Sequence, residues 1–275
     1  MVRPNSSVHL DRHVASRRQI LRDSWARFTE VVPDMRRPWC AVLLWGGIAV
    51  GTALSILLGS IAARAASYGA VVVQAAFLLW AGGWMFLGFR RRRSAYRQRH
   101  GVLAYRQLFF RFLIPFLSVG GAAIYFPLVV GGPQLLQPAI AYGIAAYFLI
   151  TAHLIERRGV EIFWDIEWRA FVYNVFPERG HVATSGIFAW LRHPVYSAAI
   201  RFAFGLALVR NNVSALLCAA LVGLGVWVLG NAEERELQQR DQDYAAYRRS
   251  VPAFFVGRPV RFWRYLGTGR GDHIR

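Results

Sequence analysis

The stretch LRHPVY, residues 191–196, places two basic side chains directly in front of a long apolar run. Arg192 and His193 precede Pro194, which suits the first turn of a helix because its missing amide proton costs nothing there. The positive end of a helix dipole repels cations, so helix stability alone does not explain the basic pair. Together with the free amides of a first helical turn, Arg192 and His193 favour binding of a carboxylate or phosphate. In the alternative structural reading, Arg192 pairs with a lipid phosphate and His193 caps the helix.

A second group of polar side chains follows the last apolar run. Glu233 and Glu234 lie where this run gives way to a charged segment, and Pro252 is expected to end any helix there. A solvated charge run explains the acidic and basic residues but predicts no tyrosines at helical spacing. If the helix continues, steps of three, four and seven place one set on a single face: Glu233, Leu237, Arg240, Tyr244, Tyr247 and Val251.

The elements that position these residues are membrane helices. Apolar residues make up 55% of the 275-residue chain and the mean hydropathy is +0.30, which is too apolar for a soluble protein of this size. A helix needs about 20 apolar residues to cross the hydrocarbon core. The sequence predicts an all-α bundle of about six transmembrane helices: Trp39–Ala62, Gly69–Phe89, Phe109–Val130, Pro138–Ile155, Pro194–Val209 and Val213–Gly230.

The distribution of charge predicts the topology. The formal net charge is +18, and every basic residue counted in it is an arginine. Arginines are concentrated before the first span and after the second, and such loops stay on the cytoplasmic side. We therefore expect both termini, residues 156–193 and the tail from Asn231 to be cytoplasmic, in the plasma or inner membrane. Anionic lipid headgroups, rather than nucleic acid, are the expected partners of these arginines.

Three parts of the chain are expected. Residues 1–38 form a basic cytoplasmic segment with an amphipathic interfacial helix, on which Trp25 and Val32 share the apolar face. Residues 39–137 form N-terminal transmembrane helices, and residues 138–275 form a core that carries the chemistry. Cys40 and Cys218 lie in apolar spans as small hydrophobes, and neither disulfide nor metal-site spacing is present.

The two polar groups together resemble a known family. GHVATSGIFAWLRHPVY, followed after about 40 residues by EERELQQRDQDYAAYRRSVPAF, is similar to the isoprenylcysteine carboxyl methyltransferases and their phospholipid methyltransferase relatives. These are integral membrane enzymes that use S-adenosylmethionine. The resemblance covers roughly the last 100 residues and implies a cytoplasmic cofactor site and a lipophilic methyl acceptor.

The resemblance also implies roles for individual residues. A carboxylate on the cofactor would suit Arg192 and His193, and its ammonium and hydroxyls would suit Glu233 and Glu234. Tyr196 or Tyr244 would face the sulfonium by cation–π attraction. The first half of the implied cofactor site contains six residues: His181, Gly186, Arg192, His193, Pro194 and Tyr196.

Two departures from the family pattern concern the acceptor. The family has a glycine where Ala198 stands, and Phe-Gly where Arg240 and Asp241 stand. Prenylated cysteine, an aminophospholipid, a small thiol and an isoprenoid acid all stay open as acceptors. A carboxylate needs no base, whereas an amine or thiol needs one. The candidate bases are Glu234, Tyr247 and His181, and the candidate acceptor-binding residues are Arg201, Arg240 and Tyr247.

Arg201 is the only charged residue between Pro194 and Val209. A charge near mid-membrane costs about 2.5–3.5 kcal/mol or more, so we expect Arg201 to point into the bundle. There it binds an anionic group of the acceptor or pairs with a backbone carbonyl.

Two other function classes compete with methyl transfer. Sterol reductases resemble the C-terminal architecture and use a nicotinamide cofactor, but they usually carry an arginine and an aspartate where Glu233 and Glu234 stand. A non-catalytic membrane scaffold is the third possibility, and Ala198 and Arg240 would then mark lost activity.

Overall fold

The computed structural model describes residues 32–179 and 182–269, together with positions 19, 22, 25, 26 and 29. For residues 160–173 and 179 the description covers the backbone only. The expected interfacial helix near the N-terminus therefore lies mostly outside the described residues. Its described positions are helical, and Trp25 packs against an aromatic cluster of the bundle.

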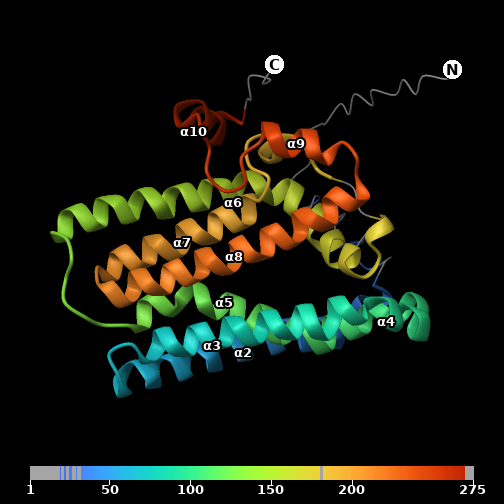
Figure 1. The fold of residues 1–275 in the computed structure, drawn as a ribbon, viewed down its shortest axis with the longest axis horizontal. Coiled ribbons are helices and arrows are strands. Elements are labelled where there is room, and N and C mark those ends of the chain that lie inside the picture. The colour runs from blue at the N-terminus through green and yellow to red at the C-terminus, as the bar shows by residue number, and fades with distance from the viewer. Residues whose placement is uncertain are drawn as a thin grey trace.

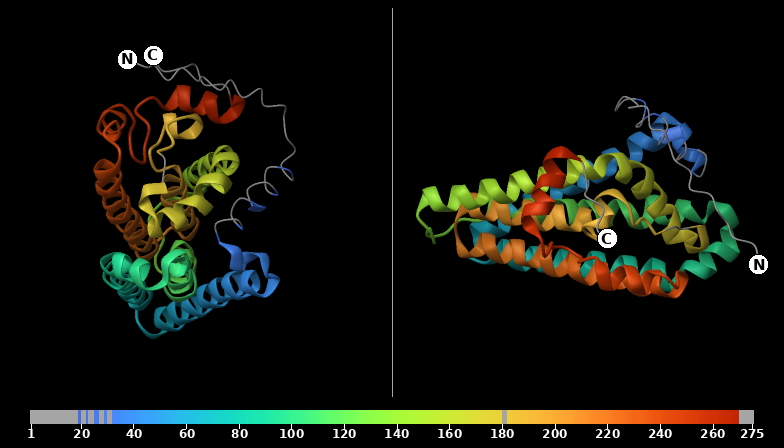
Figure 2. Two further views of the ribbon diagram at one scale, coloured as in Figure 1. Left: turned by 90° about the vertical axis from the view of Figure 1, so that its right-hand side faces the viewer. Right: turned by 90° about the horizontal axis from the view of Figure 1, so that it is seen from above.

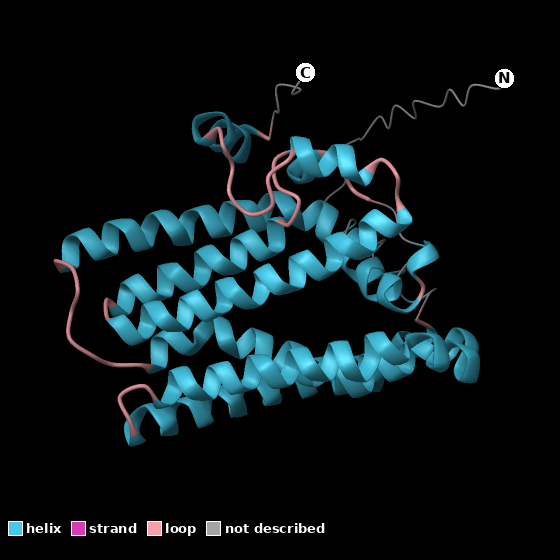
Figure 3. Cartoon of the chain, in the orientation of Figure 1, coloured by secondary structure: helices cyan, strands magenta, loops and turns pink. Residues whose placement is uncertain are grey.

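Every regular element in the described part of the chain is helical, as the sequence predicts (Figure 3). Helices α4 and α10 are not among the elements expected from the sequence. Two π-helical stretches, Trp84–Phe89 and Gln107–Leu113, follow α3 and precede α5. The α-helices are α2 (Pro38–Ala65), α3 (Gly69–Gly83), α4 (Arg93–His100), α5 (Ile114–Val129), α6 (Pro138–Val175), α7 (Pro194–Arg210), α8 (Val213–Arg240), α9 (Tyr244–Ser250) and α10 (Pro259–Thr268).

Five stretches in the described residues are long and apolar enough to cross a membrane, so the chain is an integral membrane protein. The fifth expected span, Pro194–Val209, forms α7, which has only 17 residues. It extends about 25 Å, because Pro194 begins it and the left-handed Asn211 caps it. The described residues thus contain five long apolar spans rather than about six. The five run over Pro38–Ala65, Gly69–Ala104, Gln107–Val129, Pro138–Gly159 and Val213–Arg240.

The helices form two groups joined by α5. Helices α6, α7 and α8 run side by side, with α7 in contact with both neighbours, and α2 packs on α3 (Figures 1 and 2). Helix α5 contacts α2 and α3 on one side and α7 and α8 on the other. The end of α8 and α9 lie toward the same end of the bundle as α4 (Figure 1). The cytoplasmic orientation of this end stays a prediction.

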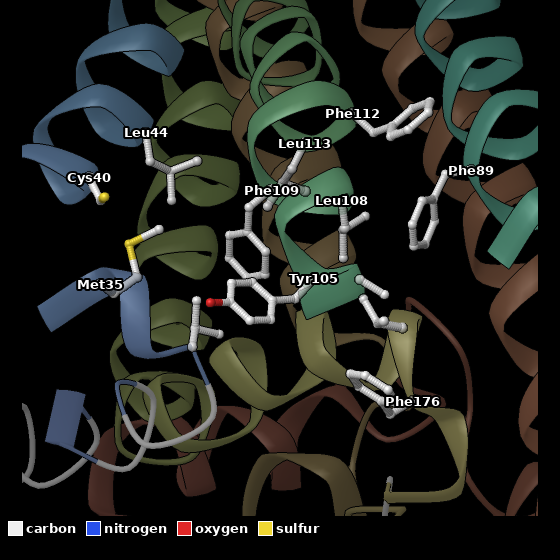
Figure 4. Packing of buried hydrophobic residues seen from close by; sticks show 13 residues of the cluster. Met35, Cys40, Leu44, Phe89, Tyr105, Leu108, Phe109, Phe112, Leu113 and Phe176 are labelled. Carbon is white, nitrogen blue, oxygen red and sulfur yellow. The ribbon is translucent and has the colours of Figure 1, made fainter. Parts of the chain in front are cut away.

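An aromatic cluster packs the bundle at the end that carries α4 (Figure 4). Phe112 is fully buried and contacts Trp84 and Phe89, with ring centroids 5.3 and 5.5 Å apart. Val175 and Phe176, at the end of α6, belong to the same cluster. The cluster therefore joins the N-terminal helices to the segment that leads into the polar residues 191–196.

A buried glutamine links three helices inside the membrane region. The Nε2 of Gln74 on α3 donates hydrogen bonds of 3.0 Å to the carbonyls of Ala123 on α5 and Cys218 on α8. Its side chain is fully buried. Polar side chains between membrane helices stabilise their association because hydrocarbon offers no competing partner.

We expect Gln74→Leu to lower the free energy of unfolding by about 1 kcal/mol, since both interhelical hydrogen bonds are lost. Unfolding of the purified protein in mixed detergent measures this change. Gln134→Leu, in the exposed connection between α5 and α6, is the matched control and should leave stability unchanged. Equal stability of the two variants would show that Gln74 does not hold the helices together.

Candidate active site

The two polar pairs expected to form one site lie in direct contact. Glu234 on α8 is only 4% exposed. Its Oε1 lies 2.9 Å from Nε of Arg192 and 3.0 Å from Nε2 of His193. Its Oε2 lies 2.8 Å from Nε of Arg248 on α9. A buried carboxylate is stable only when it is paired and hydrogen-bonded, so Glu234 is the centre of a cluster that joins the start of α7, the end of α8 and α9.

The imidazole of His193 is buried in this cluster. Its ring stacks between Tyr196 and Phe254, with both centroids 5.5 Å away. Burial of the imidazole lowers the pKa of His193, and the carboxylate of Glu234 opposes that shift. Its Nε2 lies 3.0 Å from Oε1 of Glu234, and its Nδ1 lies 3.7 Å from Oε2 of Glu233.

Glu233 is the accessible carboxylate of the pair. Its side chain is 46% exposed, and its Oε1 accepts a hydrogen bond of 2.6 Å from the hydroxyl of Tyr196. Successive residues of an α-helix point about 100° apart, so Glu233 and Glu234 face different surroundings. Glu234 pairs with other side chains of the cluster, and Glu233 presents oxygen atoms at the edge of the cluster.

Arg192 is bonded within the protein. Besides Glu234, its Nη1 donates to the carbonyl of Val251 at 2.7 Å. Its backbone N–H donates to the carbonyl of Pro252 at 2.9 Å. Arg192 therefore neutralises Glu234 and holds the segment after α9, and its binding of a cofactor carboxylate stays a prediction.

The continuous helical face expected from Glu233 to Val251 is wrong. Helix α8 ends at Arg240, and Asp241 is extended with φ −131° and ψ 112°. The side chain of Asp241 accepts a hydrogen bond of 2.9 Å from the N–H of Asp243. Short acidic side chains compete in this way for backbone N–H groups and favour turns over helices, so α9 begins separately at Tyr244. The expected stop before Pro252 is confirmed, because α9 ends at Ser250.

Both tyrosines of α9 pack inward. Tyr244 is 2% exposed, and its ring centroid lies 5.7 Å from that of Tyr247. The hydroxyl of Tyr247 donates to the carbonyl of Phe188 at 2.7 Å. Burial raises the pKa of both phenols, so both stay protonated at neutral pH. This favours a structural contact for Tyr247 over service as a general base.

The two arginines expected near the acceptor both bind backbone carbonyls. Arg201 is buried within the bundle, as expected, and its Nη1 lies 3.1 Å from the carbonyl of Phe254. Arg240 is exposed, and its Nη1 lies 2.5 Å from the carbonyl of Pro177. Contact of either side chain with an acceptor stays a prediction.

The remaining expected residues belong to the segment before α7. Pro194 is the first residue of α7, as expected. Gly186 has a positive φ of 62°, a conformation that favours glycine, and it begins the short turn that presents the carbonyl of Phe188 to Tyr247. His181 lies outside the described residues.

Three residues of the cluster are not among those expected from the sequence. Arg248 binds Glu234 and keeps 44% of its side chain exposed. Phe254 covers the ring of His193. A Cβ at Gly230 would lie 3.1 Å from the Phe254 ring and 3.5 Å from Nε2 of His193, so Gly230 packs closely against both rings. Of these three, only Arg248 had a sequence signal, because it directly follows the expected residue Tyr247.

The N-terminal helices also reach this region. Glu236, three residues after Glu233 on α8, forms ion pairs with Arg90 and Arg93. These arginines belong to the basic run after the second span, whose charge predicted only topology. They attach the N-terminal half of the chain beside the accessible carboxylate.

The buried His193 predicts a pH dependence of stability. Because its pKa is lower in the folded chain, the unfolded chain binds the proton more readily, and stability falls as pH drops below the ordinary histidine pKa of about 6.5. We expect the melting temperature to fall less between pH 7.5 and 5.5 in His193→Gln than in the wild type. His153→Gln, at an exposed position on α6, should retain the wild-type slope, and a wild-type slope in His193→Gln would contradict this account.

Comparison with known proteins identifies the segment that contains most of this cluster. Residues 140–240 match the family model described as phospholipid methyltransferase. The match begins near the start of α6 and ends with α8, so it includes Arg192, His193, Glu233 and Glu234 but not α9. No curated protein and no solved structure matches the chain. The resemblance drawn from the sequence is therefore confirmed, but over residues 140–240, which match the phospholipid methyltransferase family, rather than over roughly the last 100 residues.

Proposed function

We propose that the chain is an S-adenosylmethionine-dependent methyltransferase that methylates a lipophilic acceptor. The observation that carries the proposal is the carboxylate of Glu233, nearly half exposed beside His193 and Tyr196. It lies in the segment that matches the methyltransferase family, and that match supports S-adenosylmethionine as the cofactor.

The side chains around Glu233 fit the polar groups of this cofactor. A carboxylate suits its ammonium and ribose hydroxyls, and Glu233 has oxygen atoms available for them. The cofactor's own carboxylate needs a cation. The guanidiniums of Arg192 and Arg248 both pair with the single carboxylate of Glu234, and Arg248 keeps 44% of its side chain exposed. We assign the exposed part of Arg248 to the cofactor carboxylate, with Arg192 beneath it.

The expected first half of the site supplies the remaining contacts. The ring of Tyr196 is suited to face a sulfonium, an attraction worth about 0.5–2 kcal/mol. The turn at Gly186 and the start of α7 at Pro194 fix the backbone that leads to this ring. Tyr244 is buried beneath the cluster and in this proposal supports the site rather than touching the cofactor.

For methyl transfer, the protein mainly has to align the methyl donor with the acceptor and exclude water. Bound here, S-adenosylmethionine would supply an electrophilic methyl group on a sulfonium. In this proposal the stacked rings of Tyr196, His193 and Phe254 serve to exclude water from one side of the reacting groups. A carboxylate acceptor needs no base, whereas an amine or thiol must lose a proton. Glu233 is better placed to take it than Glu234, whose oxygens are already bonded.

The acceptor is proposed to come from the bilayer and the cofactor from the cytoplasm. The family match supports a lipid-like acceptor, such as a lipid amine or a prenylcysteine-type carboxylate. The site lies beside Arg90 and Arg93. These two arginines belong to the basic segment that the positive-inside rule predicts to be on the cytoplasmic face of a plasma or inner membrane. A soluble cofactor would reach the site from that face.

We expect Glu233→Gln to weaken binding of S-adenosylhomocysteine by about 1.5 kcal/mol or more, which is about tenfold, because a hydrogen bond to a charged group is lost. Titration of the purified protein in detergent measures this affinity. Glu156→Gln, at an exposed position on α6, is the control and should bind like the wild type.

The same preparation discriminates the competing function classes. A methyltransferase should be protected against heat by S-adenosylhomocysteine, a reductase by NADPH and a scaffold by neither. Protection by NADPH alone, or unchanged affinity in Glu233→Gln, would contradict the proposed function.

A further inference from the structure

Arg201 is a buried charge on α7 with no ion pair in the described part of the chain. It is 6% exposed, and its three hydrogen bonds all come from Nη1. They reach the carbonyl and the hydroxyl of Ser197, one turn earlier, and the carbonyl of Phe254 at 3.1 Å. Its guanidinium carbon also lies 4.8 Å from the ring centroid of Phe255. The contacts of Arg201 outside its own helix therefore converge on residues 254 and 255.

These residues belong to a strap, defined here as Val251–Phe255, in the loop between α9 and α10 (Figure 3). The strap has no helical structure, so its position depends on contacts with other elements. The N–H groups of Arg192 and His193 donate to its carbonyls at Pro252 and Ala253, at 2.9 and 3.1 Å. Through these two hydrogen bonds, the residues at the start of α7 hold the first half of the strap in place.

The second half of the strap is held by Ser197 and Arg201. The hydroxyl of Ser197 donates to the carbonyl of Phe254 at 2.6 Å, and Arg201 donates to the same oxygen. The ring attached to that residue stacks on His193 and lies against Gly230. The guanidinium of Arg201 thus binds the backbone carbonyl of Phe254, the residue whose ring stacks on His193.

We propose that Arg201 is a positioning residue that latches the strap, so that Phe254 stays stacked on His193 at the cofactor site. This inference rests on the proposed function. An arginine suits the task because its planar head bonds a carbonyl and a hydroxyl while stacking on an aromatic face. A lysine offers donors but no planar face, so it would restore the hydrogen bond without the stacking.

If Arg201 latches the strap, its substitution should weaken binding at the cofactor site. We expect Arg201→Gln to raise the dissociation constant of S-adenosylhomocysteine about fivefold, the effect of losing about one hydrogen bond. Arg201→Lys should give an intermediate value. Arg210→Gln, at the other end of α7 where the side chain binds the carbonyl of Val130, should stay within about twofold of the wild type.

A double-mutant cycle tests whether Arg201 acts through the strap. In a Phe254→Ala background, Arg201→Gln should raise the dissociation constant no further, because the ring that it positions is gone. Fully additive effects would overturn the latch. So would a folded Arg201→Gln protein with wild-type cofactor affinity and a raised Michaelis constant for the acceptor, since Arg201 would then bind the acceptor.

A labelling experiment makes the latch testable without any cofactor. The thiol introduced by Ala253→Cys reports on the strap, and the native Cys40 and Cys218 are buried. We expect Arg201→Gln to speed maleimide labelling of this thiol about fivefold or more, and Arg210→Gln to leave it unchanged. Unchanged labelling in Arg201→Gln would overturn the latch. Faster labelling with no cofactor binding even in the wild type would keep the latch and reject the proposed function.

Discussion

The burial of one carboxylate organises the polar end of this protein. Glu234 is nearly inaccessible, and Arg192, His193 and Arg248 supply its partners. Removing a charge from water costs several kcal/mol unless it is paired and hydrogen-bonded. The start of α7, the end of α8 and α9 therefore have to meet around this carboxylate. Its neighbours in space come from positions about 40 residues earlier and 14 residues later in the chain.

Glu233 and Glu234 are adjacent in sequence but have different surroundings, and this difference determines which of them can bind a ligand. Because Glu234 is occupied by the fold, Glu233 is left at the edge of the cluster with accessible oxygens. The segment that matches the methyltransferase family contains both residues. The parts outside the match also contribute: Arg248 on α9 contacts Glu234, and Arg90 in the N-terminal half contacts Glu236 one turn from Glu233. The site is thus built from more of the chain than its motif covers.

The sequence predicted the features that depend on local pattern. Apolar runs located the membrane helices, and residue types at the start of α7 and the end of α8 located the cluster. The pattern could not predict which of two adjacent glutamates is buried, because that depends on how α8 is rotated against α7. The turn at Asp241 was missed because helical periodicity carries no information about side chains that compete for backbone N–H groups. Phe254 and Arg90 were missed because only tertiary contacts bring them to the cluster.

We propose that the accessible carboxylate of Glu233 serves methyl transfer in the membrane. The most direct measurement incubates membranes that contain the protein with S-adenosylmethionine labelled in its methyl group, and then separates lipid, protein and volatile products. The account predicts that label enters the lipid extract, or a lipid-modified protein, with the wild-type chain and far less with Glu233→Gln. Label transfer that is equal in membranes with and without the protein, or that is unaffected by Glu233→Gln, would contradict it.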